Sequence, residues 1–177
     1  MAEPAARPGD GSESTLLDGT RLPKDDARFE ALGAVDELSA ALGVVRAELS
    51  LSGNAAEANG IREVQRVLVR LGAEIATAPG SALLERIERP TEADLAALES
   101  LERSFAGRAP RPTGFVLPGA TPLEARVHVA RTVCRRAERR VVSCLRSGLP
   151  HLALAHRYLN RLSGCLFWLA LCHGLDG

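Results

Sequence analysis

The sequence predicts an all-α protein: an up-and-down bundle of five helices with ferritin-like packing and an irregular N-terminal arm. Three observations favour this fold. Aromatic residues make up only 3% of the 177 residues, whereas strands favour aromatic and β-branched side chains. Apolar residues recur at spacings of three and four along five long segments, which is the period of a helix. Short breaks rich in glycine and proline separate those segments, so consecutive helices are expected to run antiparallel.

The N-terminal half is predicted to hold the arm and two helices. Residues 1–27 are rich in Gly, Pro, Ser and Asp and indicate an irregular arm, which leaves 28–177 as a single bundle domain. A first helix is predicted from Asp26 to Ser50. Its apolar side consists of Phe29, Leu32, Val35, Leu38, Leu42 and Val45. A second helix is predicted from Ala56 to Ala78, where a Pro-Gly pair ends it.

Capping residues mark the remaining helices. Thr91 and Asp94 have the spacing of a capping box, so a third helix is expected to start near Thr91. A proline-containing loop follows it. The fourth helix is predicted from Thr121 to Ser147, with Glu124 completing a second capping box. The fifth helix is predicted from Leu152 to Cys172.

Composition excludes several classes of function. The formal net charge is +0, which argues against a general nucleic-acid binder because phosphate affinity needs an excess of Lys and Arg. Charged residues make up 25% of the chain, and no apolar run approaches the roughly 20 residues that a membrane span needs. The N-terminus lacks the apolar core of a signal peptide. We therefore expect a cytoplasmic protein, or one of the mitochondrial matrix if the source is eukaryotic.

The cysteines do not predict a metal site. None of them falls in a CxxC or CxxH pattern, so a zinc site is not expected. All of them lie in predicted helices, where a small buried thiol is the ordinary interpretation and suits a reducing interior. These residues are Cys134, Cys144, Cys165 and Cys172.

The fourth helix carries charges in line with its apolar side. Arg131, Arg135 and Glu138 fall within about 60° of one another on a helical wheel. One interpretation is a solvated basic face whose arginines pair with Glu138. The other is a polyphosphate site, because a guanidinium binds phosphate oxygens with two parallel hydrogen bonds. Six arginines lie between residues 131 and 146, so local positive charge is high despite the neutral total.

Other segments leave two interpretations open. Asp36 lies on the apolar side of the first helix, either as a partner of Arg131 or as a surface residue. The glycines and hydroxyls of the arm could wrap a phosphate or form a disordered terminus. The apolar loop 114–119 either plugs the end of the bundle or contacts an apolar ligand. Asn160 and Ser163, three residues apart in the fifth helix, indicate a hydrogen bond between helices.

Four blocks of sequence together resemble the ATP:cob(I)alamin adenosyltransferases of the trimeric, five-helix-bundle type. The first block joins 23–26 to 30–38, and the second is the loop 115–119. The third is the arginine-rich segment 128–139, and the fourth is 158–163. Their order and spacing match the family over nearly the whole chain.

This resemblance implies a function. It implies transfer of the 5′-deoxyadenosyl group of ATP to cob(I)alamin, with release of triphosphate and with Mg²⁺ bound alongside ATP. It also implies a homotrimer with its sites between subunits, and as further partners a cobalamin reductase and an adenosylcobalamin-dependent mutase. The arm reads Pro-Gly-Asp-Gly-Ser at residues 8–12, where the family has Thr-Gly-Asp-Lys-Gly. A carrier or chaperone of cobalamin on the same fold, with weakened catalysis, is therefore the alternative.

The resemblance also assigns roles to individual residues. Those implied to act in catalysis are Asp36, Phe115, Arg131 and Arg135. Those implied to bind ATP are Arg7, Pro8, Gly9, Ser14, Thr15, Lys24, Arg135, Arg136, Glu138, Arg139 and Asn160. Those implied to bind cobalamin are Asp36, Phe115 and Leu117. No side chain is expected to ligate a metal ion.

Overall fold

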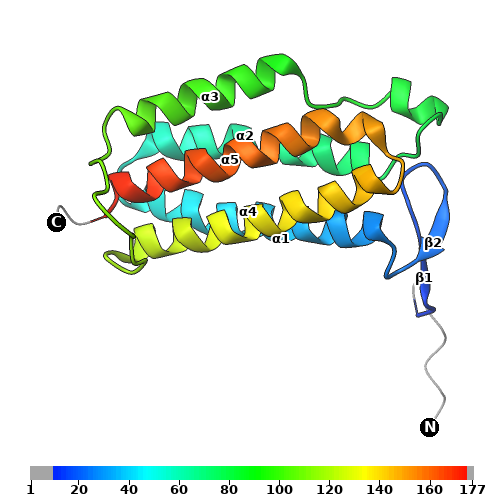
Figure 1. Ribbon diagram of the computed structural model, residues 1–177, viewed down its shortest axis with the longest axis horizontal. Coiled ribbons are helices and arrows are strands. Elements are labelled where there is room, and N and C mark those ends of the chain that lie inside the picture. Colours follow the sequence, from blue (N-terminus) through cyan, green and yellow to red (C-terminus); the bar gives the residue numbers. More distant parts are fainter. Residues whose placement is uncertain (1–9, 175–177) are drawn as a thin grey trace, which may run out of the picture.

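The computed structural model describes residues 10–174 and confirms the predicted five-helix bundle (Figure 1). The long helices alternate in direction, so the chain runs up and down the bundle as expected. The elements are β1 (Glu13–Thr15), β2 (Arg21–Pro23), α1 (Ala27–Leu51), α2 (Ala55–Ile75), η1 (Ala82–Glu85), α3 (Glu92–Ala106), α4 (Pro122–Arg146), η2 (Pro150–Leu152) and α5 (Ala153–Cys172).

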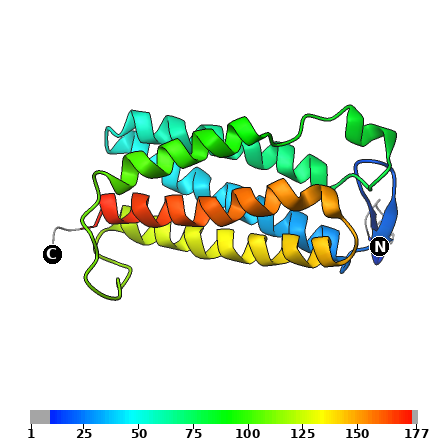
Figure 2. The same ribbon diagram turned by 45° about the horizontal axis from the view of Figure 1, so that its top comes forward.

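The helices pack in a ring whose strongest contacts lie around α4. Helix α1 packs against α2 and α4, α4 packs against α5, and α5 packs against α3, while α2 and α3 touch only lightly (Figure 2). The centre is filled by fully buried side chains, most of them aliphatic, with Tyr158 and Phe105 among them. They include Leu38, Leu42, Leu49, Ile61, Leu68, Leu71, Ile75, Leu159, Leu162 and Leu166. No helix within residues 10–174 has the length and apolar character needed to cross a membrane.

Side-chain caps fix the starts of α1, α3 and α4. The capping box of α3 is confirmed, because Thr91 and Asp94 each accept a hydrogen bond from the backbone of the other. At α4 the expected box is only half present. Thr121 accepts from the backbone N–H of Glu124, but the Glu124 carboxylate accepts from Gly119 and Ala120 instead. The buried carboxylate thereby fixes the end of the loop that leads into α4.

The arm corrects the sequence prediction, since its described part is not irregular. Strands β1 and β2 form an antiparallel hairpin with Ser14 opposite Leu22. Gly19 in the connecting turn has a φ of 84°, which suits glycine because it has no side chain to clash. Each strand has three residues, too few to produce the alternating pattern by which strands are recognised in a sequence.

Candidate functional site

The charged and apolar sides of α4 are next to each other. Its core side includes Val127, Ala130, Cys134, Ala137, Val141 and Cys144, all fully buried. Arg131 and Glu138 are half-buried beside that core, whereas Arg135 is exposed. The arginines are therefore not sealed inside the bundle. They border its surface, where a ligand can reach them.

Three of the α4 arginines are paired with α1, and one of them is Arg126, which pairs with Glu48. Arg136 bonds to Glu37, and Arg140 lies 3.2 Å from Glu30 between the Nη2 and Oε2 atoms. A hollow of about 330 Å³ lies between the two helices, and Phe29 and Gly33 of α1 also line it. Sequence analysis missed these acidic partners. Glu30 and Glu37 are seven residues apart, which places them two turns apart on one face of α1. This spacing is the signal by which the sequence could have indicated them.

Two other arginines keep their guanidinium groups available. Within residues 10–174, the side chains of Arg135 and Arg139 make no hydrogen bond or ion pair. Arg139 lines a hollow of about 280 Å³ together with Arg136, Arg140 and Ser143. The interpretation in which Arg131 and Arg135 pair with Glu138 is wrong for residues 10–174, because the Glu138 carboxylate accepts a hydrogen bond from Asn160 at 2.8 Å and lies 3.6 Å from His156 Nε2. Asn160 thus makes the expected hydrogen bond between helices, whereas Ser163 Oγ donates to the carbonyl of Asn160 within α5 at 2.9 Å.

Asp36 and Arg131 do not meet within one chain, although α1 and α4 pack together as expected. Asp36 is exposed, and no ion pair in the described part of the chain includes it. Arg131 Nε instead donates to His128 Nδ1 at 3.3 Å. Burial lowers the pKa of His128, and the Arg131 charge lowers it further against the opposing effect of Glu124. The predicted pair is thus not made by the single chain.

The arm and the apolar loop lie at opposite ends of the bundle (Figure 1). The arm enters α1 beside the end of α4, where Cys144 Sγ donates to the carbonyl of Ala27. Phe115 and Leu117 precede the other end of α4, and both side chains are exposed, at 106% and 86%. The loop therefore does not plug the bundle, which overturns that interpretation. The 25 residues of α4 separate the two features by about 37 Å.

The remaining predicted residues lie partly within and partly outside the described structure. Ser14 and Thr15 form part of β1, and Lys24 directly follows β2, where its backbone N–H donates to Ser12 at 2.8 Å. Residues 7–9, which include the predicted Arg7, Pro8 and Gly9, lie outside the described residues. The structure thus gathers the described arm residues on one hairpin and leaves them apart from Phe115.

Thiols and metal ligands do not form a second centre in residues 10–174. Cys134, Cys144 and Cys165 are buried and Cys172 is half-buried, all as free thiols. Burial raises the pKa of Cys144 to about 11. No cluster of three His, Cys, Asp or Glu side chains in this part of the chain could hold a metal ion. The buried-thiol interpretation is confirmed for the first three.

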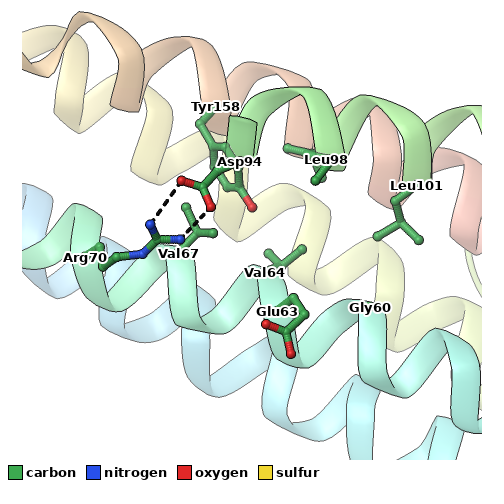
Figure 3. A pocket seen from close by; sticks show the side chains of 10 residues that line it. Gly60, Glu63, Val64, Val67, Arg70, Asp94, Leu98, Leu101 and Tyr158 are labelled. Atoms are coloured by element: carbon green, nitrogen blue, oxygen red, sulfur yellow. Dashed lines mark hydrogen bonds and ion pairs between the residues drawn. The ribbon is translucent and has the colours of Figure 1, made fainter. Parts of the chain in front are cut away.

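A pocket of about 260 Å³ lies at the loose seam between α2 and α3 (Figure 3). Its walls are mostly apolar, with Val64, Leu98 and Leu101 facing into it. Its guanidinium, Arg70, is already held by two hydrogen bonds to Asp94, at 2.6 and 3.0 Å. Among the described residues that line this pocket, Arg70 is the cation and it is already paired, so the pocket suits an anionic ligand less well than the surface of α4 does.

Known proteins are similar to this chain over nearly its whole length. Residues 5–173 match the family described as cobalamin adenosyltransferase. The corrinoid adenosyltransferase of Citrobacter freundii is 40% identical over 165 residues, which cover 93% of this chain and 90% of that protein. The human corrinoid adenosyltransferase MMAB is 36% identical over 164 residues, covering 92% of this chain and 65% of that protein.

Solved structures give the same result. One is a phenylalanine-to-alanine variant of the PduO-type ATP:corrinoid adenosyltransferase from Lactobacillus reuteri, complexed with cobalamin and ATP. It superimposes with a TM-score of 0.79 at 30% identity, covering 93% of this chain and 89% of that one. An arginine-to-lysine variant complexed with ATP has a TM-score of 0.76, also at 30% identity, covering 92% of this chain and 89% of that one. The chain therefore belongs to the cobalamin adenosyltransferase family.

Proposed function

We propose that this protein transfers the 5′-deoxyadenosyl group of ATP to cob(I)alamin and releases triphosphate. One observation carries the proposal beyond family membership. Arg135 and Arg139 present guanidinium groups that make no hydrogen bond or ion pair with the described residues, and Arg139 lines a hollow on the surface of α4. Such groups match phosphate oxygens in charge and in geometry. The site therefore has the chemistry that the triphosphate of ATP requires.

No residue of the protein forms or breaks a covalent bond in this reaction. The cobalt(I) of the substrate supplies an electron pair to C5′ of ATP and forms the cobalt–carbon bond. The bond between C5′ and the triphosphate oxygen breaks, and its electron pair leaves with triphosphate. No general base is needed because no proton is removed. The charge that develops on triphosphate is stabilised by Arg135, Arg139 and Lys24, with Mg²⁺ bound to the phosphate oxygens.

Phe115 has a different role in the proposal. Its fully exposed ring, with Leu117 nearby, offers an apolar surface to the lower face of a corrin. A ring in that place excludes an axial ligand from cobalt, and cobalt(II) without that ligand is easier to reduce. The protein thus tunes and orients its substrates, while the corrin supplies the reactive metal.

A homotrimer completes the site in this proposal. A bound ATP carries its reacting carbon next to its triphosphate, so the arm and the Phe115 loop must converge on one nucleotide. In one chain they lie a helix length apart, which favours a site completed by a neighbouring subunit. Exposed apolar side chains on α1 and α4 suit such an interface: Val44, Leu51 and Val129. A neighbour would also bring Arg131 to Asp36.

The activity is tested by mixing the protein anaerobically with cob(I)alamin and MgATP. The proposal expects the absorbance of adenosylcobalamin to appear and to be lost on exposure to light. A solution mass measurement tests the trimer. Failure to form adenosylcobalamin under fully reducing conditions would contradict the proposed reaction.

Mixed trimers test whether two chains share one site. Lys24→Ala and Phe115→Ala chains are each assayed alone from cob(II)alamin, and then after unfolding and refolding together. If the arm and the loop come from different chains, random assembly gives about a quarter of the sites both native groups. Activity would then rise well above that of either variant. No rise on mixing would place both groups in the same chain.

The altered arm supports a second candidate, a cobalamin carrier with weakened catalysis. Its residues 10–12 read Asp-Gly-Ser and lack the lysine that the family has in this segment. The carrier hypothesis expects tight binding of adenosylcobalamin without release of triphosphate. Either function would be exercised in a reducing compartment, the cytoplasm or the mitochondrial matrix, beside a cobalamin reductase and an adenosylcobalamin-dependent mutase.

A further inference from the structure

We propose that Asp18 is a positioning residue for ATP, because it fastens the arm hairpin to the end of the bundle. The proposal rests on the proposed function, in which Ser14, Thr15 and Lys24 hold the triphosphate. None of the sequence motifs includes Asp18. Its role follows from the contacts that the folded chain gives it.

Asp18 joins three segments that are distant in sequence. Its Oδ1 accepts a hydrogen bond from the backbone of Thr20 at 2.9 Å, which shapes the hairpin turn. Its Oδ2 accepts from the backbone N–H of Ala78, just beyond the end of α2. The same oxygen lies 3.8 Å from Arg28 Nη2, in the first turn of α1. Arg28 Nε in turn donates to the carbonyl of Ile75 at 3.1 Å.

This contact is buried, unlike the ion pairs elsewhere on the hairpin. The side chains of Asp18 and Arg28 are 2% and 9% exposed, whereas Arg21 and Glu13 on the strands are 69% and 49% exposed. Burial alone would raise the pKa of Asp18. The hydrogen bonds from Thr20 and Ala78, with the Arg28 charge, outweigh burial and lower that pKa. The carboxylate is therefore ionised at neutral pH and holds its partners as an anion.

The hairpin is small, so its contacts with the bundle decide its position. A two-stranded hairpin is marginal in water by itself, and these strands have three residues each. The outward side chains of both strands are exposed, and Leu16 in the turn is the apolar hairpin residue that becomes buried, at 5% exposure. Leu16 and Asp18 together form the attachment. The apolar contact is non-directional, so the carboxylate is the group that sets the orientation.

The attachment lies close to the predicted phosphate ligands. Thr15 is three residues before Asp18 in the chain, and Lys24 is six residues after it. Strand pairing transmits the position of the turn to both of them, since Thr15 is opposite Arg21 in the register. Releasing the turn would let Ser14, Thr15 and Lys24 move together while α4 stays in place. ATP would then have to fix the arm as it binds, at the expense of affinity.

The experiment compares Asp18→Ala and Asp18→Asn with the wild type and with Glu13→Gln. Glu13 is a matched control, because it is an exposed carboxylate on the same hairpin and, among the described residues, its side chain pairs with Arg21. Hydrogen exchange of residues 13–24 is measured without ligand, and ATP affinity is measured by calorimetry. Circular dichroism confirms that the bundle remains folded. Neither measurement depends on turnover.

We expect Asp18→Ala to speed exchange in the hairpin and to weaken ATP binding on the order of tenfold, the effect of losing a charge-assisted bond. Asp18→Asn, which keeps an acceptor oxygen, should lie between it and the wild type. In assays with turnover, KM for ATP should rise while kcat and KM for cob(I)alamin change little.

The attachment of the hairpin, the positioning role of Asp18 and the proposed reaction are each contradicted by a different result. Unchanged exchange in Asp18→Ala would overturn the attachment. Faster exchange with unchanged ATP affinity would overturn the positioning role. A wild type that binds ATP but forms no adenosylcobalamin would refute the proposed reaction and leave the positioning role supported, provided that the variants lose affinity. If the wild type binds no ATP, both proposals fail.

Discussion

Glu74 on α2 should make the stability of the protein depend on pH in an unusual direction. Its side chain is buried at 3% exposure, and its Oε2 has no hydrogen-bond partner among the described residues. Arg89 approaches Oε1 only to 3.7 Å. Burial raises the pKa of Glu74 from its ordinary value of 4.5 to about 7, against the weaker opposing effect of Arg89.

The sign of the effect follows from proton linkage. Between pH 4.5 and 7 the folded protein binds a proton at Glu74 that the unfolded chain has released. Folding therefore becomes less favourable as pH rises through this range. With these two pKa values, stability falls by about 2.5 kcal/mol between pH 5 and pH 8 through this one group.

Glu74→Gln removes the titrating group and keeps the shape of the side chain. We expect the difference in unfolding free energy between variant and wild type to grow by about 2 to 3 kcal/mol between pH 5 and pH 8. For a chain of this size that corresponds to roughly 5–10 °C in Tm. Urea or thermal unfolding at several pH values measures it. The comparison between the two proteins cancels the titration of the histidines.

Glu63→Gln is the matched control, because Glu63 is an exposed carboxylate on the same helix that pairs with Arg66. It should leave the pH profile of stability unchanged. Parallel profiles for the wild type and Glu74→Gln would refute the reasoning. They would mean that water or a partner stabilises the Glu74 carboxylate in the folded state.

Three further predictions concern the site and the bundle. Phe115→Ala should reduce turnover from cob(II)alamin much more than it reduces ATP affinity, and unchanged turnover would remove the axial-ligand argument. Arg135→Ala should lower kcat/KM for ATP by about 10- to 100-fold through loss of a charge-assisted phosphate contact. Arg146→Ala, at an exposed arginine of the same helix, is its control, and an equal effect of the two would assign Arg135 only a general electrostatic role. Thr91→Ala should destabilise the protein by about 1 kcal/mol in urea unfolding, because α3 loses its N-cap; no change would mean that Asp94 and Arg70 suffice to hold that end.

The helices could be predicted because their signals are local. Thr91 with Asp94, and Thr121 before Pro122, mark helix starts by chemistry that acts within four residues. The apolar period then fixes which side of each helix is buried, and Leu38, Leu42 and Val45 are fully buried as that period requires. The errors at helix ends are small for the same reason: the second helix ends at Ile75 rather than at Ala78.

The contacts of the candidate site could not be predicted in this way. The arginines of α4 were visible in the sequence, but their partners come from other elements. Arg136 meets Glu37 and Glu138 meets Asn160 only because α4 packs between α1 and α5. Asp36 was expected to meet Arg131 and does not, since antiparallel packing places them at different heights along the bundle.

By itself, the sequence determined the fold class, the number and order of the helices, and the residues that carry the resemblance to the cobalamin adenosyltransferase family. These depend on local propensity, on the helical period and on motifs read along the chain. Only the tertiary structure decided that the arm is a hairpin attached through Asp18, and that it lies a helix length from the loop 114–119. It also decided which arginines remain available to a ligand. The physical reason is that a buried ion pair or a fixed separation depends on groups that packing brings together. Asp18 and Ala78 are 60 positions apart in the sequence, so no local pattern indicates their contact.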